Sequence, residues 1–173
     1  IQGVSGGVEG TSTAAGFAGV GEDAYASIRN ITLADIHLAL HAESERDKRA
    51  TDGIAISNAE GIDLRAVALD WDAQAPEPKW AHGLALRTVR NFRIAQFENR
   101  SVPQNREAAV LLTDAQHGSL NCSAPTPVGQ VYCQVTGSQT RDLHIQAPKS
   151  IKPAQLTVEP AARKAVLITY CPQ

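Results

Sequence analysis

The sequence predicts an all-β protein, a right-handed parallel β-helix of about five coils. The first observation is a mixed hydrophobic step in the stretch 49–71, RATDGIAISNAEGIDLRAVALDW, where apolar residues recur every two or three positions. A helix would show a period near 3.6, and a long strand would keep a step of two. The pattern therefore predicts very short strands joined by corners.

The second observation is that this spacing returns along the chain at intervals of 22–31 residues. The fifth copy is weaker and carries one inserted residue before Leu143. The five copies occupy residues 23–40, 49–71, 81–99, 108–122 and 131–146. One copy cannot bury its apolar face alone, but stacked copies build a continuous core, as in a solenoid.

The third observation concerns the corners. Asn30, Gly61, Asn91 and Gly118 are expected at the same corner of four coils, because these residue types tolerate the left-handed backbone that a corner needs. Leucine-rich repeats share the period, but they require a Leu-x-x-Leu-x-Leu pattern that the chain lacks. A β-sandwich would not keep corner residues in register. Both alternatives are therefore weaker than the parallel β-helix.

We expect a single domain over residues 1–173. Residues 1–22 form a glycine-rich leading segment of turns, residues 23–147 form the coils, and residues 148–173 form a tail. Within the tail, two strands over 156–159 and 165–170 are expected to cap the open end of the solenoid. The chain begins at Ile1 and contains no methionine, so we expect it to derive from a longer, processed protein.

Charge and composition limit the partners. The chain has 16 basic and 18 acidic residues, a net charge of −2, so no nucleic acid or anionic membrane surface is expected. No apolar run approaches the length of a membrane span. The three cysteines have no metal-ligand spacing, and we expect no metal and no cofactor. Cys122 and Cys133 flank a Pro/Gly loop and either form a disulfide or stay free; the pairing with Cys171 is open.

The loop DWDAQAPEPKWAHG is the stretch richest in functional groups. Trp71, Trp80, Glu77 and Lys79 are our candidates for substrate binding, because aromatic faces beside carboxylates and a cation bind sugar and uronate groups. We expect the loop to stand above the sheet, with Trp80 and Glu77 facing a groove. The alternative is that both tryptophans cover the edge of the coil beneath an ordinary loop.

Asp52 and His82 are the candidate catalytic residues. Each lies two positions before an inward residue, Ile54 or Leu84, so both should lie at the same edge of neighbouring coils, with backbones about 4.8 Å apart. A carboxylate beside an imidazole can orient it and raise its pKa, which suits acid–base chemistry. The alternative is a solvated ion pair or an aspartate that stabilises the corner.

Three phrases, IRNITLADIHLAL, DGIAISNAEGIDLRAVAL and AHGLALRTVRNFRIAQFEN, resemble the coils of glycoside hydrolase family 28, the polygalacturonases and rhamnogalacturonases. The resemblance covers roughly residues 27–145. The family's Asn-Thr-Asp, Asp-Asp, Gly-His-Gly and Arg-Ile-Lys motifs have partial counterparts here, in the same order but with different spacing. These counterparts are residues 50–52, 70–72, 81–83 and 93–95.

The resemblance implies a secreted or periplasmic glycosidase that cleaves a uronate-containing polysaccharide by inversion, with two carboxylates spaced to admit a water. This chain would supply the C-terminal coils and a cleft wall. The N-terminal coils of the parent protein would be its partner and would carry the catalytic aspartates, so this chain alone would be inactive. Two alternatives stay open. One is a non-catalytic polysaccharide-binding or adhesin module, and the other is a carbohydrate lyase, which would need calcium-binding acidic clusters.

Overall fold

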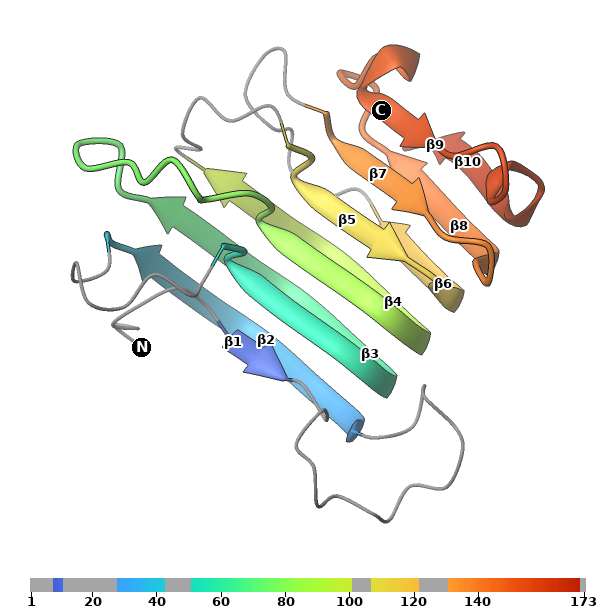
Figure 1. Ribbon diagram of the computed structural model, residues 1–173, viewed down its shortest axis with the longest axis horizontal. Helices are drawn as coiled ribbons and strands as arrows, with labels where there is room; N and C mark the ends of the chain where they lie inside the picture. The colour runs from blue at the N-terminus through green and yellow to red at the C-terminus, as the bar shows by residue number, and fades with distance from the viewer. Residues whose placement is uncertain (1–7, 11–27, 43–50, 101–106, 122–130, 172–173) are drawn as a thin grey trace.

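The computed structural model describes residues 8–10, 28–42, 51–100, 107–121 and 131–171. They form a parallel β-solenoid, which confirms the predicted fold class (Figure 1). Every pairing between described strands is parallel, and successive coils stack on one another. The strands are β1 (Val8–Gly10), β2 (Ile28–Leu40), β3 (Ile54–Trp71), β4 (Leu84–Arg100), β5 (Val110–Thr113), β6 (Gln116–Asn121), β7 (Cys133–Thr136), β8 (Arg141–Ala147), β9 (Leu156–Val158) and β10 (Val166–Tyr170).

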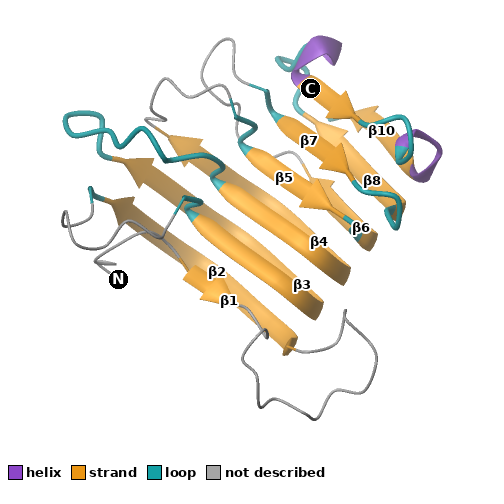
Figure 2. Ribbon diagram, viewed as in Figure 1, coloured by secondary structure: helices purple, strands orange, loops and turns teal. Residues whose placement is uncertain are grey.

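The long strands bend around the coil. In β3 the backbone takes positive φ at Asn58, Gly61 and Ala66, which divides the strand into the short segments that the sequence predicts. Its first segment lies in the layer with β5, β7 and β9, here called the front layer. Its segment 62–65 lies in line with β6, β8 and β10 in the back layer, and its last segment, 67–70, continues this layer between β2 and β4 (Figures 1 and 2).

Inward residues align from coil to coil and build the core. One such column is Ile54, Leu84, Val110, Cys133 and Leu156. The separation of stacked residues falls from 30 positions between Asp52 and His82 to 23 between Thr113 and Thr136, within the predicted interval. Most core residues are aliphatic, and Tyr132 and Phe97 are among its largest fully buried side chains.

One predicted corner residue is displaced by a single position. Asn30, Gly61 and Asn91 stack at a positive-φ corner as expected, but the next coil places His117 there. Gly118 instead faces inward opposite Phe92, where an added Cβ would lie 2.1 Å from Cε1 of the ring. A glycine is required at position 118 because the ring of Phe92 leaves no room for a Cβ, and not because the corner needs it.

The fifth copy contains two extra residues where one was predicted. Leu112 pairs with Val135 and Gly118 pairs with Leu143, so the fifth coil is longer by two positions between these points. A turn takes up the additional length, with the backbone N–H of Thr140 donating to the carbonyl of Gly137.

The N-terminal end differs from the expected turns, whereas the C-terminal end has the expected strand pair. β1 was expected as part of a turn segment, but it pairs with β3 as a further rung; the rest of residues 1–22 lies outside the described residues. β9 and β10 occur where strands were predicted, and they extend the front and back layers in parallel register. They are therefore one more rung of the solenoid, with Leu167 61% exposed.

The cysteines have different states. Cys133 is a buried free thiol in the core, and Cys171 is disulfide-bonded. A pairing of Cys122 with Cys133 is therefore wrong, while Cys122 itself lies outside the described residues. None of the helices in the described part of the chain is long and apolar enough to cross a membrane.

Candidate functional site

The backbone brings Asp52 and His82 to the same edge of the front layer. The ladder between β3 and β4 begins before the strands themselves. The N–H groups of Gly53 and Ile54 donate to the carbonyls of His82 and Gly83 at 2.8 and 2.9 Å, and Ala81 N–H donates to Thr51 at 2.7 Å. The stacking that the sequence predicts for Asp52 and His82 is therefore confirmed.

The glycine after each of these residues permits close packing. A Cβ at Gly53 would lie 2.8 Å from the carbonyl oxygen of Gly83. A Cβ at Gly83 would lie 2.6 Å from Cγ of Asn99. The sequences Asp-Gly-Ile and His-Gly-Leu thus place a polar residue at the coil edge immediately before the chain enters the core.

Asp52 is the centre of a hydrogen-bonded cluster. Its Oδ1 accepts from Nδ1 of His82 at 2.8 Å and from the backbone N–H of His82 at 3.2 Å. Its Oδ2 accepts from Nη2 of Arg87 at 2.9 Å. Since a carboxylate only accepts, these contacts assign a proton to Nδ1. On the other side of the ring, Nε2 of His82 lies 3.6 Å from Oε2 of Glu107.

These contacts keep Asp52 ionised. Burial alone would raise the pKa of its carboxyl, since only 7% of the residue is exposed, but the hydrogen bonds and positive charges of His82 and Arg87 outweigh burial. The pKa of Asp52 therefore lies below its ordinary value. A carboxyl in this state orients an imidazole but does not donate a proton.

The cluster has the components of an acid–base site. His82 is fixed in orientation by Asp52, and its Nε2 is directed toward Glu107, whose side chain is 54% exposed. Arg87 adds a cation whose side chain remains 38% exposed. A ligand with a hydroxyl or carboxylate group could meet an imidazole nitrogen, a guanidinium and a carboxylate at one edge of the coil.

The two tryptophans are not at the surface, so the predicted groove-facing position of Trp80 is wrong. Trp71 is 4% exposed and Trp80 is 3% exposed, and both belong to the core. Their rings pack at a centroid distance of 5.0 Å and an angle of 53°. Trp71 Nε1 also donates to Oδ1 of Asn99 at 2.7 Å. Burial of two large aromatic side chains is more favourable than their exposure to water, so both tryptophans pack into the core.

The charged residues of the same loop are engaged with one another. Lys79 Nζ lies 3.2 Å from Oε2 of Glu77, and both side chains are mostly covered. Asp72 accepts backbone hydrogen bonds from Gln74 and Ala75, which holds the start of the loop. The four predicted sugar-binding residues are close in space, but the tryptophan faces they would offer are turned inward.

Two other counterparts of the family motifs lie away from Asp52. Asp70 is paired with His37 at the end of the back layer. Arg93 lies on the segment of β4 that pairs with β6, in the back layer (Figure 1). Only the counterparts at 50–52 and 81–83 come together.

Sequence reasoning missed Arg87 and Glu107. Arg87 is three positions after the inward residue Leu84, so its outward direction follows from strand alternation. Its reach across to Asp52 in the preceding coil becomes visible only with the register. Glu107 follows a segment outside the described residues, and no spacing in the sequence indicates it.

Comparison of the chain with protein-family models, with curated proteins and with solved structures gave no match. Within the described ranges, no three His, Cys, Asp or Glu side chains gather as metal ligands. The functional interpretation therefore depends on the coil architecture and on the cluster around Asp52.

Proposed function

We propose that this chain is the C-terminal part of a polygalacturonase-like glycoside hydrolase acting on pectic or other uronate-containing polysaccharide. The observation that carries the proposal is the contact between Asp52 and His82. These residues are the counterparts of the aspartate and histidine motifs in the resemblance, and they meet at one edge of the front layer beside Arg87. The parallel coils support the proposal, because this fold presents an elongated face suited to a linear polymer.

In this proposal His82 is the residue that exchanges a proton through Nε2, and Asp52 is its ionised orienting partner. Arg87 is close enough to contribute to binding of a uronate carboxylate. An inverting glycosidase needs two carboxyl groups about 6.5–9.5 Å apart with a water between them. Asp52 is ionised and committed to hydrogen bonds, so the proton-donating carboxyl would come from the N-terminal coils of the parent protein.

The test uses the full-length parent protein and polygalacturonate, with release of reducing ends as the readout. We expect release by the wild type and a loss of at least a hundredfold in His82→Ala, in line with general acid–base contributions of about 10²–10⁴. The matched control is His144→Ala, which changes a histidine in the back layer. Unchanged release by His82→Ala would refute the assigned role.

A second candidate function is a non-catalytic polysaccharide-binding module of a cell surface or adhesin. It is favoured by the hydrogen bonding of Asp52. The two carboxylate oxygens accept three hydrogen bonds from His82 and Arg87, so this carboxylate is not available to act on a substrate itself. Binding of polygalacturonate by the full-length protein without release of reducing ends would support this function. If the protein neither binds nor cleaves the polymer, both candidates are refuted.

We also propose a secreted or periplasmic location. The disulfide at Cys171 supports it, because disulfides persist in oxidising compartments. Fractionation of the source cells, followed by thiol labelling of the protein without reductant, tests the location. Recovery in the reducing cytosol with all three cysteines labelled would refute it.

A further inference from the structure

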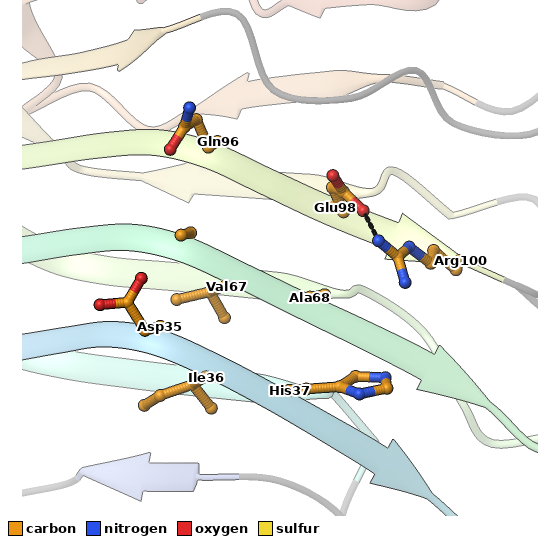
Figure 3. Close-up of a pocket in the computed structure, with 9 residues that line it drawn as sticks. Asp35, Ile36, His37, Val67, Ala68, Gln96, Glu98 and Arg100 are labelled. Carbon is orange, nitrogen blue, oxygen red and sulfur yellow. Dashed lines mark hydrogen bonds and ion pairs between the residues drawn. The ribbon is translucent and has the colours of Figure 1, made fainter.

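We propose that the back layer carries a second binding site, which takes a neutral, hydroxyl-rich glycan chain. The site is a hollow of about 560 Å³ on the outer face of β2, β3 and β4 (Figure 3). This volume is within the range of small-molecule sites in proteins, about 300–1,000 Å³. The hollow does not include Asp52, His82 or Arg87, so the inference does not depend on the function proposed above.

The hollow exists because the middle strand carries small residues. Ala68 lies between His37 of β2 and Glu98 of β4 in the parallel register. Ala66 lies on the same strand, at a positive-φ corner. The larger side chains of the neighbouring coils form walls two strand spacings apart, about 9–10 Å. The result is a trough along β3 that is wide enough for one sugar chain.

The walls present polar groups suited to hydroxyls. Asp35 and Gln96 stand at one end of the trough, and His37, Glu98 and Arg100 stand at the other (Figure 3). Glu98 and Arg100 form an ion pair, which fixes a carboxylate and a guanidinium beside one another. Carboxylate, amide, imidazole and guanidinium groups together accept from and donate to the hydroxyls of a sugar.

An extended peptide is a poorer fit for the same trough. A peptide that binds to a β-protein usually adds to an open sheet edge through its backbone. Here the floor is β3, whose backbone pairs with β2 on one side and with β4 on the other. A peptide lying on this strand would meet side chains alone and leave its own backbone groups without partners from the sheet.

The charge of the trough selects against uronates. Asp35 and Glu98 line it, and Asp70 is held against His37 at its edge, while Arg100 is its permanent cation. Among the described residues Asp35 takes part in no ion pair. Three carboxylates against one guanidinium and one histidine give the trough a negative balance. A uronate carboxylate would be repelled there, whereas a neutral sugar would not.

The test is calorimetric titration of the full chain with galactotetraose, cellotetraose and xylotetraose, and with tetragalacturonate as the charged comparator. We expect saturable binding of at least one neutral tetrasaccharide, and binding of tetragalacturonate at least tenfold weaker at this site. Ala68→Phe fills the floor and should weaken neutral binding at least tenfold. The matched control is Ala55→Phe, on the front-layer segment of the same strand, which should leave this binding unchanged.

A further variant tests the charge selection. Asp35 has φ +54°, a conformation that asparagine also tolerates, so Asp35→Asn should preserve the backbone. The ratio of the affinity for the neutral tetrasaccharide to the affinity for tetragalacturonate should fall at least threefold in this variant. The proposal is overturned if no neutral tetrasaccharide binds, or if Ala55→Phe weakens binding as much as Ala68→Phe. An octapeptide of serine and lysine tests the alternative occupant. The proposal is also overturned if this peptide binds in the trough and none of the tetrasaccharides displaces it.

Discussion

Replacing Trp80 by alanine should destabilise the whole solenoid, although the residue lies in a loop between two coils. Trp80 is 3% exposed and packs against Trp71 at a centroid distance of 5.0 Å. Truncation of a buried tryptophan costs about 3–5 kcal/mol, the sum of lost transfer free energy and an unfilled cavity. Since a domain of this size has about 5–15 kcal/mol of stability in total, the variant should retain only part of it.

The assay is urea unfolding followed by far-UV circular dichroism, with the fluorescence of Trp71 as a second probe. The control is Gln74→Ala in the same loop, because this side chain is exposed and its backbone hydrogen bond to Asp72 is kept. We expect the control to change the free energy of unfolding by no more than about 0.5 kcal/mol. Equal unfolding midpoints for Trp80→Ala and Gln74→Ala would refute the assignment of Trp80 to the core.

Three further outcomes follow from the structure. Gly118→Ala should lower the free energy of unfolding by about 1–3 kcal/mol, because the added methyl group clashes with the ring of Phe92. The second substitution Phe92→Leu in the same chain should recover part of this loss. If urea unfolding shows that the single variant is as stable as the wild type, the prediction is wrong. The lowered pKa of Asp52 means that its stabilisation is present above the ordinary value of 3.8 and is lost as the pH falls through the folded-state pKa. The stability difference between the wild type and Asp52→Asn, measured by urea unfolding at pH 7, 5 and 3, should therefore shrink at the lowest pH, and a constant difference would count against the ionised pair. Burial raises the pKa of the Cys133 thiol to about 12, so iodoacetamide at pH 8 should label it only after unfolding, and rapid labelling of the folded protein would show that it is accessible.

The sequence predicts the inward columns and the edge pair well, because both follow from one periodic pattern. Once Ile54 and Leu84 are aligned, the contact between Asp52 and His82 follows from counting two residues back. An error of one residue in the alignment of a single coil does not change the predicted fold. The assignment of Gly118 to the corner was wrong by one residue, because glycine there serves the ring of a neighbouring coil and not its own backbone.

The candidate binding residues were less predictable. A loop that contains tryptophans and charges has the same composition whether it binds sugar or covers the core, and only the packing of Trp71 and Trp80 distinguishes these cases. No pattern in the sequence predicts the trough over β3 either. It arises because Ala66 and Ala68 are smaller than the residues stacked on both sides, and that contrast is visible only across three coils.

The parallel register also determines how the molecule should come apart. Each coil contacts mainly the coil before and the coil after it, so the stability of a coil depends mainly on whether its two neighbours are folded. The widest coils, which contain β3 and β4, have neighbours on both sides, whereas β9 and β10 are short and have a neighbour on one side among the described strands. Amide exchange should therefore be fastest in β10, where Leu167 is already in water, and slowest in the middle of β3. Among the described strands, β9 and β10 should thus lose their order before the coils that carry His82.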